Sequence, residues 1–308
     1  MRYAAGIDLG GSFVKFALVS ESGDVFFEDK LQVGGKARED ILETIRIAIQ
    51  TILTKASENK LDVAGIGIGT PGIIFDGVVL GGAENLNRWE NVDLRSIYSS
   101  KFDLPVCIDN DANVMGLGEA IFGAAKGCTD VIFLTVGTGI GGAIIMNGQL
   151  YGGYKNRGTE LGHVTVNHKG ISCSCGGRGC LEAYASTAAL IGQYAALSGL
   201  NPEEIDGKYI VDQFNKNEAI AVQSIQEHTD YLGHAIAGFI NTFAPQKVII
   251  GGGISEAGRF YIDLIKESAF SYAMPDCAKN TEIVGATLGN RAGYLGAASL
   301  IFKNLTNS

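Results

Sequence analysis

The sequence has little proline, few basic residues and no long apolar run. Its 308 residues include five prolines, against 43 glycines. No apolar stretch reaches the roughly 18 residues that a membrane-spanning helix needs. The first residues also lack the apolar core and the small-residue cleavage site of a secretion signal. We therefore expect a protein of the cytoplasm with no membrane partner.

Positive charge is scarce and dispersed. Lysine and arginine together number 24 against 33 acidic residues, and the formal net charge is −9. Binding to a nucleic-acid backbone or to an anionic membrane depends on clustered basic residues, so neither partner is expected. An acidic protein can still bind a nucleotide, because backbone N–H groups and a bound metal ion can hold phosphates.

The chain reads as two halves with the same order of elements. Each half begins with a strand, a glycine turn and a second strand, at 4–9 and 13–20 and again at 131–136 and 143–146. Later parts of both halves alternate helix with strand. This pattern predicts a duplicated α/β unit with mixed sheets and a ligand cleft between the halves.

Hydrophobic spacing places the remaining elements. It predicts helices over 38–58, 92–102, 112–122, 181–198, 217–243, 256–271 and 293–303. Short apolar runs predict strands over 25–27, 63–68, 106–108, 247–250 and 281–285. We divide the chain into a first lobe, 1–117, and a second lobe, 118–292. Whether the closing segment 293–308 returns to the first lobe is left open.

Three glycine clusters follow predicted strands, at 10–12, 137–142 and 251–253. Glycine in such a turn lets backbone N–H groups approach an anion, because no Cβ stands in the way. Ser12 and Thr138 add hydroxyl groups, and Asp8 is placed to anchor a hydrated Mg²⁺. Any one cluster alone is also compatible with a plain hairpin turn, but three together predict a phosphate site.

Two other nucleotide sites are disfavoured. The sequence contains no GxxxxGK[ST] motif, which excludes a Walker-type loop. GxGxxG strings occur at 67–72 and 137–142, but a dinucleotide site requires a helix directly after the loop. The second string runs into a strand instead, and Pro71 interrupts the first.

Polar residues gather between a predicted strand and helix, in the segment Asp109-Asn110-Asp111-Ala112-Asn113. One such residue would serve as a helix cap, but a cap does not need four. Phosphoryl transfer to an alcohol requires a carboxylate that accepts the hydroxyl proton and a neighbour that positions the alcohol. We predict Asp111 as the base and Asn110 as the neighbour, with Asp109 and Asn113 supporting the loop and capping the helix.

Three of the six cysteines lie within eight residues, at Cys173, Cys175 and Cys180, and His163 precedes them. A Cys₃His set suits tetrahedral zinc, and four protein ligands leave no open position for chemistry. We therefore predict a structural zinc ion, with His168 as an alternative ligand and a redox role as an alternative function.

Two glutamates flank this cluster: Glu160 precedes His163 by three residues, and Glu182 follows Cys180 by two. A zinc ion that holds His163 and Cys180 together would bring both carboxylates to one place. Paired carboxylates are well suited to bind sugar hydroxyls. The alternative is that both glutamates are ordinary surface groups.

Taken together, these motifs resemble the ROK family of sugar kinases and repressors. The resemblance spans residues 8 to about 255, and the cysteine motif with its histidine is its most specific part. It rests on Asp8-Leu9-Gly10-Gly11-Ser12, Gly69-Thr70-Pro71-Gly72, Asp109 to Asn113, Gly137 to Gly142, Glu160-Leu161-Gly162-His163, Cys173 to Ala183 and Gly251 to Ser255. Two departures are small: Ser12 replaces a commoner threonine, and Ala143 replaces a frequent glycine.

The resemblance implies an actin-like ATPase (ribonuclease H-like) fold of two lobes, with ATP-Mg²⁺ and a hexose in the cleft between them. It implies Asp111 as the catalytic base and the zinc ligands named above. Sugar contacts are expected at Gly72, Asn85, Asn110, Asp111, Glu160, His163 and Glu182. Nucleotide contacts are expected at Asp8, Gly10, Gly11, Ser12, Lys15, Gly137, Thr138 and Gly139, with Gly252 and Gly253 on the adenosine side.

The function expected from the resemblance is transfer of phosphate from ATP to the 6-hydroxyl of a hexose, with glucose as the first candidate. N-acetylmannosamine, N-acetylglucosamine, fructose and allose remain open as substrates. A non-enzymatic, sugar-responsive regulator is the alternative of another class. Family repressors carry an N-terminal helix-turn-helix domain, whereas here the nucleotide strand begins at residue 4, which favours the kinase. A homo-oligomer, either a dimer or a tetramer, is also implied.

Overall fold

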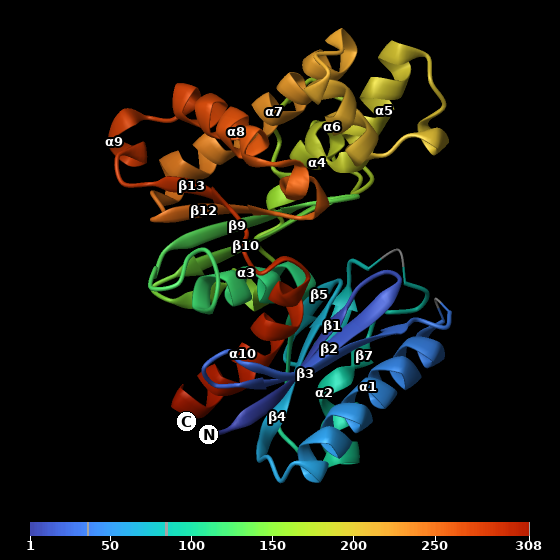
Figure 1. Ribbon diagram of the computed structural model, residues 1–308. Coiled ribbons are helices and arrows are strands. Elements are labelled where there is room, and N and C mark those ends of the chain that lie inside the picture. The colour runs from blue at the N-terminus through green and yellow to red at the C-terminus, as the bar shows by residue number, and fades with distance from the viewer. Residues whose placement is uncertain (36, 84–85, 308) are drawn as a thin grey trace.

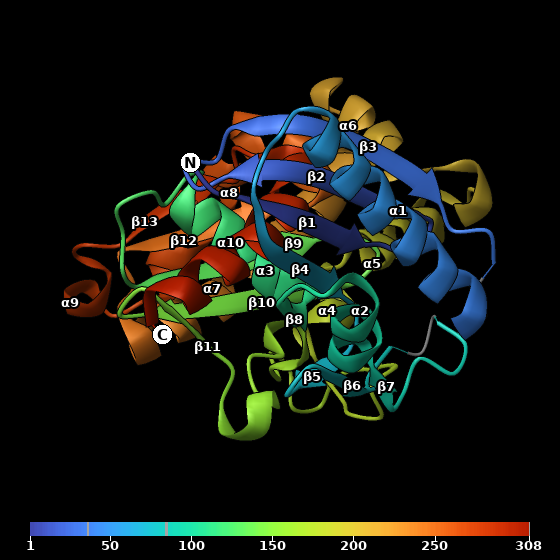
Figure 2. The same cartoon turned by 90° about the horizontal axis from the view of Figure 1, so that it is seen from below.

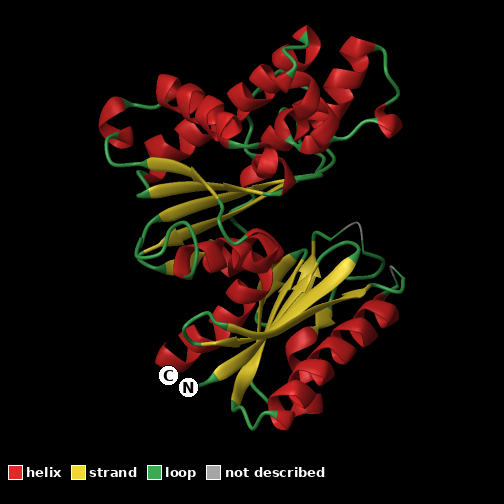
Figure 3. Ribbon diagram, viewed as in Figure 1, coloured by secondary structure: helices red, strands yellow, loops and turns green. Residues whose placement is uncertain are grey.

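The computed structural model describes residues 1–35, 37–83 and 86–307. Two five-stranded mixed sheets and a small three-stranded sheet occur in this part of the chain. Figures 1 and 3 show helices on the outer sides of the two large sheets and further helices between them. Within the described ranges, no helix is both long enough and apolar enough to span a membrane.

The first large sheet has the strand order β3-β2-β1-β4-β8. Its strands are β1 (Tyr3–Leu9), β2 (Phe13–Ser20), β3 (Val25–Gln32), β4 (Val63–Thr70) and β8 (Val106–Asn110). β1 runs antiparallel to β2 and parallel to β4, and β4 runs parallel to β8. The carboxyl ends of β1, β4 and β8 therefore meet at one edge, where ligands of open α/β sheets bind.

The second large sheet repeats this arrangement with the order β11-β10-β9-β12-β13. Its strands are β9 (Val131–Val136), β10 (Ile140–Met146), β11 (Gln149–Tyr151), β12 (Lys247–Gly251) and β13 (Glu282–Gly285). The predicted mixed sheets are thus confirmed. β10 begins at Ile140 and not at Ala143 as predicted, because Ile140, Gly141 and Gly142 already pair with β9. The glycine turn is consequently limited to 137–139.

The helices that the sequence predicted lie close to their predicted ranges. They are α1 (Arg38–Glu58), α2 (Leu94–Phe102), α3 (Asp111–Ile121), α4 (Leu181–Ala185), α5 (Thr187–Ser198), α7 (Ala219–Phe243), α8 (Arg259–Tyr272) and α10 (Ala292–Asn307). The helix predicted over 181–198 is two helices. Ser186 separates them in an extended conformation, and its hydroxyl caps α5 by accepting a hydrogen bond from the Ala189 amide at 3.0 Å.

Several elements were missed, and most of them carry too few residues for a periodic pattern. They are β5 (Ile73–Phe75), β6 (Val78–Gly81) and β7 (Val92–Asp93), which form the small sheet, together with α6 (Gly207–Asn215) and α9 (Pro275–Ala278). Five 3₁₀ turns complete the described chain: η1 (Tyr154–Asn156), η2 (Leu161–His163), η3 (Pro202–Glu204), η4 (Gly253–Ala257) and η5 (Gly289–Arg291).

The closing helix α10 packs on the first sheet and against α3, so that α3 and α10 lie between the two large sheets (Figure 1). The packing is very close. A Cβ on Gly67 would lie 1.8 Å from the Ala297 carbonyl oxygen, and one on Gly296 would lie 1.7 Å from that of Val114. The return of the closing segment to the first sheet, which the sequence left open, is thereby decided. The lobe boundary at residue 117 falls inside α3 and stays a prediction.

Separate hydrophobic cores support the two large sheets. One lies between the first sheet and α1, and Figure 2 shows α1 running along the outer side of that sheet. The other lies between the second sheet and the helices α4 to α8. The loops at the strand ends between these cores carry the polar residues described below.

Candidate active site

A cavity of about 350 Å³ is lined by residues from both halves of the chain. The first half contributes the ends of β4 and β8, and the second half contributes the turn between β9 and β10. Its wall brings together eight of the residues predicted for the site: Gly72, Asn110, Asp111, Gly137, Thr138, Gly139, Glu160 and Glu182.

Asn110 organises the polar segment at the start of α3. Its Oδ1 accepts hydrogen bonds from the backbone amides of Ala112 at 2.9 Å and Asn113 at 3.3 Å, which caps the helix. Its Nδ2 donates to the Gly72 carbonyl oxygen at 3.0 Å. The prediction that Asp109 or Asn113 supplies the cap is therefore wrong. Asn113 instead donates its Nδ2 to Asp109 at 2.8 Å, which supports the loop as expected.

Asp111 occupies the first turn of α3 and lines the cavity. Burial raises the pKa of its carboxyl group, a hydrogen bond from the Ala112 amide lowers it, and the nearby charge of Glu160 raises it again. The net direction is upward. A carboxylate with a raised pKa holds a proton more strongly, which is the property a general base requires.

Glu160 and Glu182 line the same cavity as Asp111, although 22 positions separate them in the chain. Glu182 Oε2 accepts a hydrogen bond from the Ile140 amide at 2.9 Å, which ties this carboxylate to the glycine turn. Partial burial raises the pKa of Glu160, with His163 lowering it and Glu182 raising it. The two carboxylates are thus brought together, and their role as sugar ligands stays a prediction.

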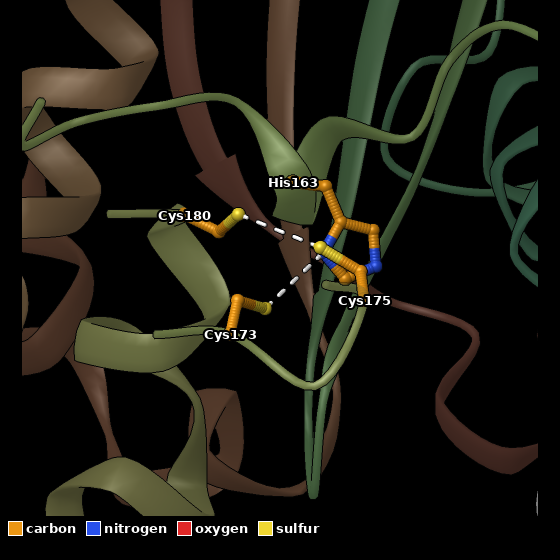
Figure 4. Close-up of side chains that lie close together, drawn as sticks. All are labelled: His163, Cys173, Cys175 and Cys180. Atoms are coloured by element: carbon orange, nitrogen blue, oxygen red, sulfur yellow. Dashed lines mark hydrogen bonds between the residues drawn. The ribbon is translucent and has the colours of Figure 1, made fainter. Parts of the chain in front are cut away.

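The predicted zinc ligands converge on one point (Figure 4). One ligand atom from each of His163, Cys173, Cys175 and Cys180 lies within 4.8 Å of all the others. Cys175 Sγ lies 3.7 Å from Cys180 Sγ, and Cys173 Sγ lies 3.7 Å from His163 Nδ1. Tetrahedral zinc with Zn–S bonds of about 2.3 Å places two sulfurs roughly 3.8 Å apart, so the four side chains fit the ion.

His163, and not His168, belongs to this group of four. Its Nδ1 is directed at Cys173, as Figure 4 shows. His163 is not one of the described residues that line the 350 Å³ cavity. Its sugar contact therefore remains a prediction.

Two further cavities adjoin the glycine turns. One of about 660 Å³ shares Gly137 and Thr138 with the first cavity and is also lined by Gly253. The other, of about 580 Å³, is lined by Asp8, Lys15, Gly252 and Gly253. Gly137 and Thr138 therefore lie between the carboxylate cavity and a larger space beside α5 and α6, and Gly253 lies between that space and the cavity lined by Asp8.

Asp8 has a buried carboxyl group at the end of β1, with only 4% of the residue exposed. No described residue donates a hydrogen bond to its Oδ1. Burial raises its pKa to about 6, with Lys15 lowering it and Asp111 raising it. A bound cation would satisfy such an oxygen, so the residue fits the predicted Mg²⁺. Lys15 pairs with Asp8 across the β1–β2 ladder and donates its Nζ to Asn290 at 2.7 Å.

Some predicted residues are not brought to these cavities. Gly10, Gly11 and Ser12 form the turn between β1 and β2, and the described linings of the three cavities do not include them. Asn85 lies outside the described residues.

Several lining residues had no signal in the sequence. Asn156 and Thr159 line the 350 Å³ cavity from an irregular loop, where neither periodicity nor a motif marked them. The 660 Å³ cavity is lined in part by α6, through Lys208, Val211, Asp212 and others. A search of 207–215 for helical spacing could have found this helix, since Ile210 and Val211 are its buried residues.

Comparisons with known proteins agree with this arrangement. Residues 4–304 match the sequence profile of the ROK family. The chain is 38% identical to a glucokinase of Thermotoga maritima over 97% of both chains. A xylose repressor of Bacillus spizizenii is 31% identical, over 98% of this chain and 77% of the repressor.

Similarity extends to solved structures. A ROK family glucokinase from Streptomyces griseus in complex with glucose and AMPPNP aligns with a TM-score of 0.82 at 30% identity, covering 98% of this chain and 99% of that one. Fold, sequence profile and relatives therefore agree. The chain belongs to the ROK family and has its actin-like ATPase fold.

Proposed function

We propose that this protein is an ATP-dependent sugar kinase that phosphorylates glucose at its 6-hydroxyl. One observation carries the proposal: Asp111, Glu160 and Glu182 line the same cavity as the glycine turn 137–139. A base, hydroxyl ligands and a phosphate cradle thus surround one space. The similarity to glucokinases supports a sugar kinase, and glucose is the substrate that two of these relatives share by name or ligand.

The sugar would be held by the polar groups of the 350 Å³ cavity. Carboxylates of Glu160 and Glu182 accept hydrogen bonds from hydroxyl groups, and such charge-assisted bonds are stronger than neutral ones. The Asn110 side chain is oriented because it caps α3 and donates a hydrogen bond to the Gly72 carbonyl oxygen. Its amide can therefore position a hydroxyl beside Asp111. The sugar is thereby fixed before the proton moves.

Asp111 would accept the proton of the 6-hydroxyl as that oxygen attacks the γ-phosphate of ATP. The O–H bond breaks, the new P–O bond forms, and ADP leaves with the electron pair of the cleaved P–O bond. The raised pKa of Asp111 suits this proton transfer, because a stronger base withdraws the proton more readily.

Phosphate binding would fall to the Thr138 hydroxyl and the backbone amides of Thr138 and Gly139, because the Gly137 amide already donates to the Gly139 carbonyl oxygen at 2.9 Å. Gly137 and Thr138 line both the sugar cavity and the 660 Å³ cavity, and Gly139 lines the sugar cavity. Asp8 would hold Mg²⁺, which when bound neutralises charge on the phosphate oxygens. The 660 Å³ cavity is large enough for an adenosine group. Its apolar wall includes Ile191 and Val211.

Zinc would have a structural role. His163 and Cys180 belong to the elements that also carry Glu160 and Glu182. An ion bound to both would hold the two glutamates in place without contacting the reacting atoms.

An ADP-release assay tests the proposal, with Mg-ATP and a panel of glucose, fructose, allose and N-acetylhexosamines. Asp111→Asn should reduce kcat by about 10²–10⁴-fold, the usual contribution of a general base. Asp103→Asn, at an exposed residue that ends α2, is the matched control and should retain activity. Turnover of another sugar in preference to glucose would reassign the substrate within the class.

A sugar-responsive regulator is the second candidate, and the similarity to a xylose repressor favours it. Binding of sugar without turnover of any member of the panel would support the regulator over the kinase. A homo-oligomer is also proposed, and light scattering would distinguish a dimer from a tetramer.

A further inference from the structure

A strained loop lies at the rim of the sugar cavity. Lys155, Asn156 and Thr159 have φ angles of 53°, 55° and 67°, in the left-handed region that non-glycine residues seldom adopt. For Thr159, a β-branched residue, this is a genuine outlier. Such strain persists only where surrounding contacts hold it, and it is concentrated at functional sites. Asn156 and Thr159 line the cavity, whereas Lys155 is exposed.

The contacts of Asn156 show what holds the loop. Its Nδ2 donates to the Ile74 carbonyl oxygen at 2.8 Å and to Asp109 Oδ1 at 3.4 Å. Ile74 and Asp109 belong to the first half of the chain, and Asn156 belongs to the second. Figure 2 shows the sheet containing β5 beside the chain that follows β11. The side chain of Asn156 therefore spans the two halves of the cavity.

Gly152 makes room for this amide. A Cβ at Gly152 would lie 1.5 Å from Asn156 Oδ1, so no other residue fits there without displacing the side chain. The loop closes on itself through a hydrogen bond from the Gly158 amide to the Gly152 carbonyl oxygen at 2.7 Å. The backbone is thus shaped to present the Asn156 amide to the first half.

Asp109 connects this amide to the catalytic segment. The same Oδ1 that Asn156 approaches also accepts hydrogen bonds from the Asn110 amide at 2.7 Å and from Asn113 Nδ2 at 2.8 Å. Asn110 and Asn113 flank Asp111 in the chain. A change at Asn156 is therefore transmitted through one carboxylate to the segment that carries the proposed base.

We propose that Asn156 is a positioning residue. It joins the loop 152–160, which ends at Glu160, to β5 and to Asp109, and so stabilises the sugar-bound arrangement of the cavity. The inference rests on the proposed function. Asn156 lines the 350 Å³ sugar cavity and does not line the 660 Å³ cavity. Loss of its hydrogen bonds should therefore weaken binding of the sugar and leave binding of ATP unchanged.

Asn156→Gly tests the inference cleanly, because glycine adopts a φ of 55° without strain. Loss of the two hydrogen bonds should raise the sugar KM about five- to tenfold, with the ATP KM unchanged. Asn156→Asp should raise the sugar KM further, because a carboxylate oxygen would then face the Ile74 carbonyl and the Asp109 carboxylate. Lys155→Gly is the matched control, since it relieves the same strain without removing a contact to the first half.

Calorimetric titration of each variant with glucose accompanies the kinetics. A sugar KM and sugar Kd that are unchanged in Asn156→Gly, or equally changed in Lys155→Gly, would overturn the inference. A wild-type protein that binds glucose without phosphorylating it would refute the kinase but still test Asn156 through the Kd. A wild-type protein that binds no sugar would overturn both proposals.

Discussion

The carboxylate of Glu119, buried near the end of α3, accepts a hydrogen bond from the backbone amide of Thr287 at 2.9 Å, although 168 residues separate the two in the chain. The same carboxylate accepts hydrogen bonds from the amides of Ala124 at 2.8 Å and Leu288 at 2.7 Å. Ala124 lies in the connection from α3 to β9, and Thr287 and Leu288 lie in the connection from β13 to α10. Glu119 therefore binds both connections between the two large sheets.

Replacement of Glu119 should destabilise the protein. Glu119→Ala leaves three partly buried backbone amides without their carboxylate acceptor and should lower the free energy of unfolding by about 3 kcal/mol. Glu119→Gln keeps the shape and one acceptor oxygen and should cost roughly half as much. Urea unfolding followed by circular dichroism gives both values. Equal stability of the alanine variant and the wild type would show that the carboxylate does not hold the connections.

The activity should depend on the ionisation of Asp111. The carboxyl group must be ionised to accept the hydroxyl proton, so kcat should fall as the pH drops through its pKa. Because burial raises that pKa, the acid limb should lie above the value of about 3.9 for an ordinary aspartate. A pH profile of kcat, with circular dichroism at each pH as a control for folding, measures the limb. A kcat that stays constant down to pH values near 4 would argue against Asp111 as the base.

Removal of the predicted zinc ion should weaken sugar binding. Cys175 is exposed, so Cys175→Ser removes a ligand with little loss of packing. Zinc affinity should fall by about 100-fold or more, since even outer-shell changes cost 10–100-fold. The sugar KM should rise because Glu160 and Glu182 lose their common anchor. Elemental analysis and kinetics give both readouts, with Cys277→Ser, outside the cluster, as the control.

Unchanged zinc content in Cys175→Ser would contradict the proposed ligand set. A variant that loses the ion but keeps the wild-type sugar KM would contradict the proposed link between zinc and the glutamates.

Two glycine substitutions should have opposite effects on stability. Gly238 lies on the exposed side of α7 with no atom within 4 Å of an added Cβ, so Gly238→Ala should stabilise the protein by about 1 kcal/mol. Gly252 has a φ of 90°, and an added Cβ would lie 2.1 Å from the Val136 carbonyl oxygen. Gly252→Ala should therefore destabilise the protein by about 2–3 kcal/mol and raise the ATP KM.

Thermal unfolding and ATP kinetics of the two variants compare these effects directly. A stable Gly252→Ala variant with normal ATP binding would show that the turn after β12 tolerates a side chain, contrary to its conformation.

The features that the sequence predicted well are local. The strand–turn–strand pattern around 137–139 depends on neighbouring residues, and so does the placement of Asp111 at the start of a helix. The grouping of His163 with three cysteines was also predicted, because Cys173, Cys175 and Cys180 lie within one short loop. Even here a detail was wrong: Asn110 and not Asn113 caps α3, since several polar residues at a helix start compete for one cap and the backbone conformation selects among them.

The features that the sequence left undetermined are contacts between distant segments. Asn156 carries no motif, and its bond to the Ile74 carbonyl depends on how the β11–η2 loop lies against the small sheet. The helix α6 borders the 660 Å³ cavity only because the helices of the second half pack as they do.

By itself, the sequence determined the α/β class, the glycine turns, the cluster of three cysteines with a histidine and the proposed base, because backbone geometry and short-range chemistry act over a few residues. Tertiary structure alone decided that α10 returns to the first sheet, that Glu119 binds both connections and that Asn156 spans the cavity. These contacts join residues tens to hundreds of positions apart. Their formation depends on which surfaces pack together, and no local pattern in the chain specifies that choice.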